Sequence, residues 1–339
     1  MVVLGIETSC DDTCAAVVCD GTRVLSNVVS SQHDLHAAFG GVVPEVASRR
    51  HVELITAVID AALAGAHLHL NDVDAIAVTQ GPGLLGSLVV GIAAAKALAV
   101  ATGKPIVALD HLDSHIYAAF LGPDPPSFPF LALVVSGGHS DLVLAREHGN
   151  LEILGRTRDD AAGEAFDKGA RLLGLGYPGG PAIQNLAEGG DDAAVAFPVA
   201  DLGGRLEFSF SGVKSELARR VERAEGTEMP ADIAASYQRA IVTPLVGTAI
   251  AAAEAHGLGT IVLVGGVAAN RRLRGELVRA ADERDIRVVL ADPAYCMDNA
   301  AMTASCGYYT LTTRGGSPLG FDAYATARST TEWLREQRA

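Results

Sequence analysis

Two histidines four residues apart carry the clearest chemical signal in this sequence. They are His111 and His115, in the segment Asp-His-Leu-Asp-Ser-His. On a helix, residues at positions i and i+4 lie on one face, so both imidazoles can bind one metal ion. A metalloprotease needs a glutamate directly after the first histidine as general base, and here that position is Leu112. The spacing therefore predicts a metal site without protease chemistry. A pair of core or surface histidines is the alternative.

Short elements around these histidines must position them. The apolar strand Pro105–Leu109 leads into Asp110, which is a suitable N-cap for a helix over Leu112–Phe120. A third ligand should be a carboxylate or another imidazole. Asp298 is the better candidate, because it opens a predicted helix after a strand and a loop. The same position also suits an N-cap aspartate, and the sequence leaves both interpretations open.

Length, charge and cysteine content limit the class of protein. The 339 residues suffice for two domains, and a net charge of −14 argues against a protein that binds nucleic acid over most of its surface. Five scattered cysteines fit a reducing cytoplasm without a disulfide framework. The N-terminal segment has no signal-peptide pattern, and the apolar stretch Leu84–Ala101, interrupted by Lys96, is expected to be a buried helix. We therefore expect a cytoplasmic protein without a membrane partner.

The pattern of strands and helices occurs twice along the chain. Each half opens with three strands, and further strands alternating with helices follow them. We expect two α/β domains stacked around a cleft, as in duplicated actin, sugar-kinase and heat-shock-chaperone folds. The segment Gly122–Pro126 is the best linker, so the expected domains are 1–122, completed by a C-terminal helix at about 310–339, and 123–309. The opening strands are expected at Val2–Glu7, Thr13–Cys19, Arg23–Ser30, Phe130–Val135, Asp141–Arg146 and Leu151–Thr157.

Three glycine-rich segments could hold a nucleotide between such domains. Glycines let backbone N–H groups approach phosphate oxygens without a Cβ atom in the way, and a following helix offers its N-terminus. Each segment taken alone is most simply a structural turn. Because all three occur where the duplicated fold needs them, together they predict a nucleotide site. They are Ser136–Gly138, Tyr177–Pro181 and Gly265–Asn270.

These elements together resemble the TsaD/Gcp family, the universal tRNA threonylcarbamoyltransferases. The similarity covers residues 5–302 in order, which is nearly the whole chain. The motifs that carry it are Gly5–Thr13, Ser48–His51, Gly81–Leu88, His111-x₃-His115, Val135–His139, Gly163–Lys168, Tyr177–Pro181, Phe208–Gly212, Gly265–Asn270 and Asp298–Met302.

The resemblance implies an activity and a set of site residues. A threonylcarbamoyl group would pass from threonylcarbamoyl-AMP to N6 of the adenosine 3′ of the anticodon, in tRNAs that read codons beginning with A. His111, His115 and Asp298 match the ligands of one divalent metal ion, iron(II) first and zinc second. ADP or ATP are further occupants of the substrate site. The residues that match the substrate phosphate loop and the nucleoside contacts are Val134, Val135, Ser136, Gly137, Gly138, Asp167, Gly180 and Asn270.

Two departures from the family pattern are informative. Val134 stands where archaeal and eukaryotic members tend to carry a tyrosine, and with His139 it is similar to the bacterial branch. Gln184 replaces a ribose-binding aspartate of many bacterial members. No residue stands out as general base, so Asp11, Asp12 and the substrate itself are all candidates.

The same resemblance implies partners. They are tRNA, an inactive paralogue of the TsaB type and a small ATPase of the TsaE type. We expect the paralogue to dock on the apolar helical surface near Glu45–Ala64. The acidic chain alone should bind tRNA weakly, because neutralisation of phosphates supplies most non-specific affinity. Two other functions stay open on the sequence: a nucleotide-dependent carbamoyltransferase acting on a small molecule, and a non-enzymatic nucleotide switch.

Overall fold

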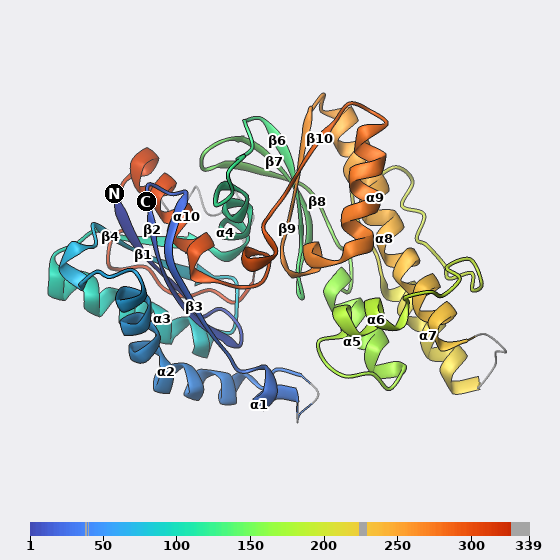
Figure 1. The fold of residues 1–339 in the computed structure, drawn as a ribbon, viewed down its shortest axis with the longest axis horizontal. Helices are drawn as coiled ribbons and strands as arrows, with labels where there is room; N and C mark the ends of the chain where they lie inside the picture. The colour runs from blue at the N-terminus through green and yellow to red at the C-terminus, as the bar shows by residue number, and fades with distance from the viewer. Residues whose placement is uncertain (38, 40, 224–228, 327–339) are drawn as a thin grey trace. The chain divides into compact units, whose positions relative to one another are not determined.

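The computed structural model describes residues 1–37, 39, 41–223 and 229–326 (Figure 1). The chain forms two compact units. Unit 1 comprises Met1–Pro126, Glu147–Leu151 and Ala291–Ala339, and unit 2 comprises Ser127–Arg146 and Glu152–Leu290. Unit 1 is therefore discontinuous, because the chain leaves it after Pro126, returns briefly at Glu147–Leu151 and returns again at Ala291.

Unit 1 contains a five-stranded sheet with the order β3-β2-β1-β4-β5. The first three strands are antiparallel, whereas β4 and β5 run parallel to β1. The central strand β1 is apolar, and its side chains alternate between two faces. The strands are β1 (Val2–Glu7), β2 (Asp12–Cys19), β3 (Arg23–Ser31), β4 (Ala75–Gly81) and β5 (Ile106–Asp110).

Helices cover both faces of this sheet. Leu4 and Ile6 of β1 point into a core shared with two helices, α2 and α3. Gly5 faces α10, where any Cβ atom would collide with the backbone of that helix at Ala300 and Ala304. This glycine allows the close approach that brings α10 onto the sheet. The helices of unit 1 are α1 (His33–Ala37), α2 (Pro44–Gly65), α3 (Leu85–Thr102), α4 (His111–Tyr117) and α10 (Ala300–Arg314), with 3₁₀ turns at Leu70–Asp72, Ala118–Phe120 and Pro293–Tyr295.

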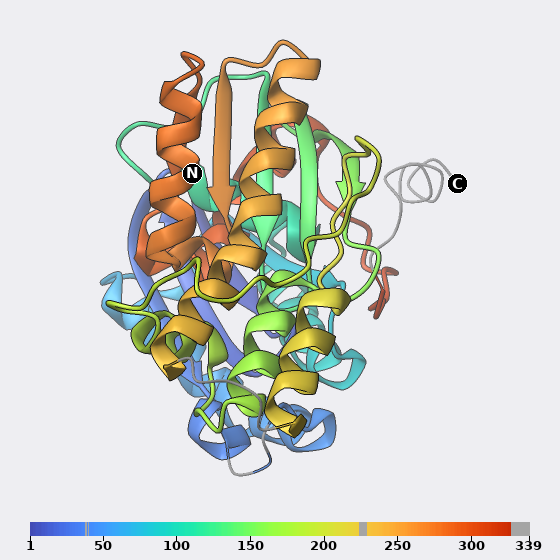
Figure 2. The ribbon, with the colours of Figure 1, turned by 90° about the vertical axis from the view of Figure 1, so that its right-hand side faces the viewer.

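Unit 2 repeats the strand order of unit 1. Its sheet has the order β10-β9-β6-β7-β8, with β6 central, antiparallel to β7 and parallel to β9. Figure 2 shows α8 and α9 lying over the strands of this sheet. The elements are β6 (Phe130–Val135), β7 (Ser140–Glu147), β8 (Asn150–Arg156), α5 (Ala162–Leu172), α6 (Gly179–Leu186), α7 (Ser211–Arg223), α8 (Pro230–Ala255), β9 (Thr260–Val264), a 3₁₀ turn at Gly266–Ala269, α9 (Arg271–Asp282) and β10 (Arg287–Leu290).

The structure differs from the sequence expectations at two places. Residues 291–309, expected in the second domain, belong to unit 1, because α10 packs on β1, β2 and β4. Helix α8 runs without interruption over Pro230–Ala255, with Pro244 inside it. The expected C-terminal helix at about 310–339 is described only to residue 326. Its residues 310–314 end α10, and residues 327–339 lie outside the described part.

Within the described residues, α3 is the one helix long and apolar enough to cross a bilayer by length and composition. A helix in the core of a soluble protein passes the same test, so this is weak evidence for a membrane span. One face of α3 is buried, with Leu88, Ile92 and Ala95 in the core of unit 1. Leu85, Val89 and Val100 lie on its exposed side.

A C-terminal strap, residues 315–326, follows α10 and returns over unit 1. Its Ser317 hydroxyl accepts a hydrogen bond from the backbone of β5 at Ala108. Its backbone carbonyl at Asp322 accepts a hydrogen bond from Gln80 at 2.6 Å. The Tyr324 hydroxyl donates to Asp110 Oδ2 at 2.7 Å. The strap therefore ties the ends of β4 and β5 together.

Candidate metal and nucleotide sites

Helix α4 places both histidines of the predicted metal pair on one face. Asp110 caps the helix as expected, because its Oδ1 accepts hydrogen bonds from the amides of Leu112 and Asp113 at 2.8 and 3.3 Å. The imidazole rings of His111 and His115 lie with their centroids 4.7 Å apart, nearly edge to face. Both side chains are buried.

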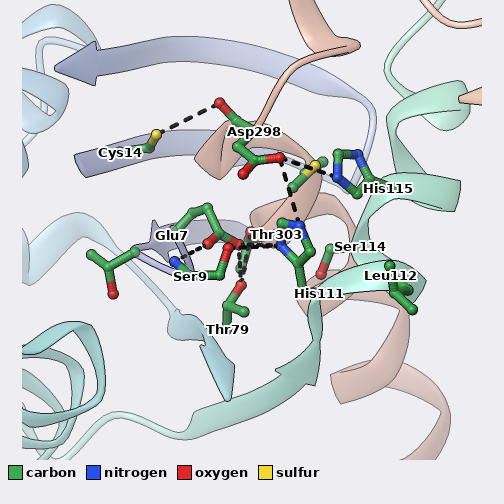
Figure 3. A network of polar contacts seen from close by, with 12 residues as sticks. Glu7, Ser9, Cys14, Thr79, His111, Leu112, Ser114, His115, Asp298 and Thr303 are labelled. Atoms are coloured by element: carbon green, nitrogen blue, oxygen red, sulfur yellow. Dashed lines mark hydrogen bonds and ion pairs between the residues drawn. The ribbon is translucent and has the colours of Figure 1, made fainter. Parts of the chain in front are cut away.

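Asp298 lies beside these two rings. Its Oδ1 is 3.2 Å from His115 Nε2 and 3.6 Å from His111 Nε2 (Figure 3). The N-cap interpretation of Asp298 is wrong, because Asn299 caps α10 by accepting a hydrogen bond from the amide of Met302. Asp298 precedes this cap and lies outside the helix, and its carboxylate faces the two histidines.

The three side chains fit a divalent cation. Their ligand atoms all lie within 4.8 Å of one another, and atoms about 2.1 Å from a common metal stand roughly 3–4 Å apart. His115 is fully buried, yet neither of its ring nitrogens makes a hydrogen bond. Such a buried, unsatisfied imidazole is costly unless another group uses it. Two imidazoles and one carboxylate are the donor set of many iron(II) sites, and zinc accepts it too. All three residues belong to unit 1.

Glu7 is a further residue of this site, and the sequence reasoning missed it. It ends β1, is fully buried, and its Oε2 lies 3.1 Å from His111 Nδ1 (Figure 3). Burial opposes protonation of His111, but the charges of Glu7 and Asp298 outweigh it and raise the pKa of the imidazole to about 9. A glutamate at the end of an apolar core strand was the available signal, because buried carboxylates need a partner.

The candidate bases Asp11 and Asp12 lie at the turn between β1 and β2. Burial raises the pKa of Asp12 to about 6, and its Oδ1 is buried without a hydrogen-bond partner. Buried His51 of α2 holds this turn in place. Its Nε2 lies 3.0 Å from the carbonyl oxygen of Cys10 and its Nδ1 lies 2.7 Å from the hydroxyl of Thr13. Of the two aspartates, Asp12 therefore has the environment of a base that titrates near neutral pH.

Unit 2 brings the predicted phosphate loop against the start of α5. The loop follows β6, and the amide of Gly163 donates to the carbonyl oxygen of Ser136 at 3.2 Å. A Cβ atom on Gly163 would lie 2.7 Å from Gly137 Cα, so only glycine permits this contact. By contrast, Cβ atoms on Gly137 and Gly138 would meet open space. The phosphate loop is thus held against the start of α5 on one side, and its two glycines border open space on the other.

The other predicted nucleoside contacts join neighbouring helices of unit 2. Asp167 accepts a hydrogen bond from the amide of Gly179 at 2.7 Å, and burial raises the pKa of its carboxyl. Asn270 caps α9 through the amide of Leu273 and donates to Gln238 at 2.8 Å. Gln184 accepts a hydrogen bond from the amide of Arg271 at 2.7 Å. Gly180 borders open space.

Val134 and Val135 are buried in β6, so only their backbone groups are available to a ligand. The carbonyl oxygen of Val135 packs against Gly265, whose φ of +93° favours glycine. Through this contact, the phosphate loop lies beside the glycine-rich segment that leads to Asn270. The three predicted glycine-rich segments are therefore linked within unit 2.

The fold and its repeated strand order define a two-domain ribonuclease H-like protein. Solved structures of similar fold include component A of (R)-2-hydroxyglutaryl-CoA dehydratase from Acidaminococcus fermentans. It has a TM-score of 0.53 and 18% identity over 92% of this chain and 100% of that one. Full-length HypF in a phosphate- and nucleotide-bound form has a TM-score of 0.60 and 12% identity, covering 93% of this chain and 56% of that one. At these identities the likeness concerns the fold alone.

The chain belongs to the TsaD family. The model of this family, described as tRNA N6-adenosine threonylcarbamoyltransferase, matches residues 23–305. A protein of that name from Symbiobacterium thermophilum is 55% identical over 91% of both chains. Another, from Clostridium perfringens, is 47% identical over 96% of this chain and 98% of the relative. These relatives give no support to a small-molecule carbamoyltransferase or a non-enzymatic switch.

Proposed function

We propose that this chain transfers a threonylcarbamoyl group from threonylcarbamoyl-AMP to N6 of the adenosine 3′ of the anticodon, in tRNAs that read codons beginning with A. The observation that carries the proposal is the convergence of His111, His115 and Asp298 in a chain of this family. The side-chain cluster in unit 1 would hold a divalent ion, iron(II) first and zinc second. When bound, that ion supplies Lewis acidity and orients oxygen atoms of the substrate.

The chain's own residues account for the remaining steps. Backbone N–H groups of Gly137 and Gly138 would hold the phosphate of the donor, which gathers negative charge as it leaves. The amide of Ser136 is already used, because it donates to the carbonyl oxygen of His139 at 2.9 Å. Asp167, Gly180 and Asn270 would border the nucleoside. Asp12 would accept the proton that the adenosine amine loses, because its pKa near 6 leaves it ionised at neutral pH.

Incubation with threonylcarbamoyl-AMP and tRNA tests this activity directly. After the reaction the tRNA is digested to nucleosides, and threonylcarbamoyl-adenosine is quantified by mass spectrometry. We expect the product only in tRNAs that read codons beginning with A. Transfer of the group to a small molecule in the absence of tRNA would contradict the proposal.

We also propose that the chain works with partner proteins. Its net charge of −14 gives an unfavourable long-range field for tRNA. An inactive TsaB-type paralogue would dock on α2 and the adjacent α3, which expose Val52, Val89 and Val100 to 64%, 55% and 67%. Exposed apolar side chains on two neighbouring helices are typical of protein interfaces. A TsaE-type ATPase would act with this pair.

Activity assays with and without the two partners test this part. We expect multiple-turnover transfer only when both are added. The substitution Val52→Asp should abolish the increase in transfer rate that the paralogue causes. Full multiple-turnover modification by the isolated chain at physiological salt would contradict it. A cytoplasmic location belongs to the same proposal, and it is supported by the five cysteines, none of which forms a disulfide in the described part of the chain.

A further inference from the structure

Glu7 is a carboxylic acid buried in the core of unit 1, with few charged side chains near it. It is fully inaccessible to solvent at the end of β1, in the middle of the sheet of unit 1. An ionised carboxylate in such a place costs several kcal/mol unless hydrogen bonds and opposite charges compensate it. The contacts of its two oxygen atoms supply that compensation.

Hydrogen bonds from three directions fix this carboxylate. Its Oε1 accepts from the backbone amide of Ser9 at 2.6 Å. Its Oε2 accepts a short hydrogen bond from the hydroxyl of Thr79 on β4, and faces His111 Nδ1 at 3.1 Å (Figure 3). The backbone turn after β1 and the neighbouring strand thus leave Glu7 one orientation, which is toward the imidazole.

The orientation of Glu7 determines which nitrogen of His111 is available. A carboxylate only accepts hydrogen bonds, so Nδ1 must carry a proton. Once Nε2 gives up its own proton to bind a cation, it is the nitrogen with a lone pair, and it faces Asp298 Oδ1 at 3.6 Å. Histidines that bind metals commonly donate their other N–H to a carboxylate, which fixes the tautomer and raises the ligand's basicity. His115 has no such partner on Nδ1, and its Nε2 lies 3.2 Å from Asp298 Oδ1.

We propose that Glu7 is a positioning residue for metal binding: it holds His111 in the Nδ1-protonated tautomer, with Nε2 directed at the ion, and Thr79 holds Glu7. This inference rests on the proposed metal site and adds an outer residue to it. The two histidines then have different roles. His111 is oriented from behind by the contact of its Nδ1 with Glu7, whereas His115 has no hydrogen-bond partner on its Nδ1.

Metal titration of the full chain tests this proposal. Dissociation constants for iron(II), under anaerobic conditions, and for zinc are measured by competition with a chelator. We expect Glu7→Gln to weaken binding 10–100-fold, the usual loss on removal of such a partner. Thr79→Val should weaken it less, about threefold. Asp113→Asn is the matched control, because it replaces a carboxyl group on the same helix, α4, and keeps the backbone amide that donates to Asp110. This control should bind within twofold of wild type.

A second readout follows the imidazole itself. In the zinc-loaded chain with ¹⁵N-labelled histidine, the Nδ1 proton of His111 should exchange slowly with solvent. In Glu7→Gln we expect at least tenfold faster exchange, with circular dichroism unchanged. If that variant fails to fold, Thr79→Val must still show weaker binding and faster exchange than Asp113→Asn.

The outcomes separate this inference from the proposed metal site. Equal metal binding by wild type and Glu7→Gln, together with loss of the ion in the double variant His111→Ala, His115→Ala, would overturn the role of Glu7 alone. Equal binding by wild type and the double histidine variant would overturn the metal site, and this inference with it.

Discussion

The two units build different chemistry on the same sheet. Both place their first strand at the centre, and both follow it with a turn of four residues. In unit 1 the turn is Thr8–Asp11, and the strand before it ends in Glu7. In unit 2 the turn is Ser136–His139, and the strand before it ends in Val135. The equivalent turn thus bears hydroxyl, thiol and carboxyl groups in one unit and two glycines in the other.

This difference shows how a duplicated fold can specialise. Unit 1 gathers ionisable side chains, Glu7, His111 and Asp298, around a point that suits a cation. Unit 2 omits side chains at Gly137 and Gly138, which leaves backbone N–H groups for an anion. The two sheets have the same strand order, and the turns after their central strands have the same length. A few positions at the ends of strands therefore decide whether a unit suits a cation or an anion.

The strongest test removes the side chains on which unit 1 depends. The double variant His111→Ala, His115→Ala should lose the bound ion completely, because a single carboxylate cannot hold it. Elemental analysis of the purified variant measures this. Circular dichroism and ADP affinity should match wild type, since the predicted nucleotide residues lie in unit 2. Equal metal content in the two proteins would show that the ion binds elsewhere.

The next test concerns the acidic turn. Asp12→Asn should slow transfer at least 100-fold, the usual contribution of a general base. In wild type, a base with a pKa of about 6 predicts a rate that rises with pH up to about 6 and is level above it. Single-turnover kinetics across this pH range measure both effects. Asp11→Asn is the matched comparison. If it alone abolishes the reaction, Asp11 is the base.

The converse test adds a side chain to the glycine turn of unit 2. Gly137→Val should weaken binding of ADP or threonylcarbamoyl-AMP tenfold or more, about 1.4 kcal/mol. The structure has room for the added carbons, so the fold should tolerate them while the phosphate does not. Isothermal titration calorimetry measures the affinity. Gly259→Val, also in open space but at the opposite end of β9 from Gly265, is the control and should bind as wild type does. Unchanged affinity in Gly137→Val would place the phosphate elsewhere.

The smallest expected effect is that of the acidic turn in unit 1 on the free energy of unfolding. Burial raises the pKa of Asp12 from 3.8 to about 6, so its contribution to stability is present below pH 3.8 and is lost as pH rises through 6. In the metal-free chain, Asp12→Asn should therefore raise the free energy of unfolding at pH 8 by on the order of 1 kcal/mol, allowing for partial exposure. Near pH 4 the two proteins should be equal. Urea denaturation at both pH values measures this, and a loss of stability at pH 8 would contradict it.

Much of the fold could be predicted from the sequence because its elements are locally encoded. The strands Val2–Glu7 and Phe130–Val135 lie where the apolar runs predicted them. The helix expected over Leu112–Phe120 is found as α4 with the 3₁₀ turn that follows it, since Asp110 marks its start. The assignment of residues 291–309 could not be obtained in this way, because it depends on which sheet α10 packs against.

The candidate site was predictable in part for a similar reason. The spacing of His111 and His115 is a local property of one helix, and Asp298 was a candidate from its place before a predicted helix, which the motif similarity supported. The contact of Glu7 with His111 joins residues 104 positions apart, and no periodicity encodes such a pairing. The N-cap assignment was wrong because Asn299, the next residue, caps the helix equally well.

The C-terminal strap makes the order of synthesis relevant to this protein. Both histidines leave the ribosome in the first half of translation, but Asp298 and Tyr324, which contacts the cap of α4, come near the end. The whole of unit 2 is made in the interval. A nascent chain can therefore fold its second unit before its first is complete. The three side chains can come together only after Asp298 has been made, so the proposed ion site cannot be complete before the second unit has been synthesised.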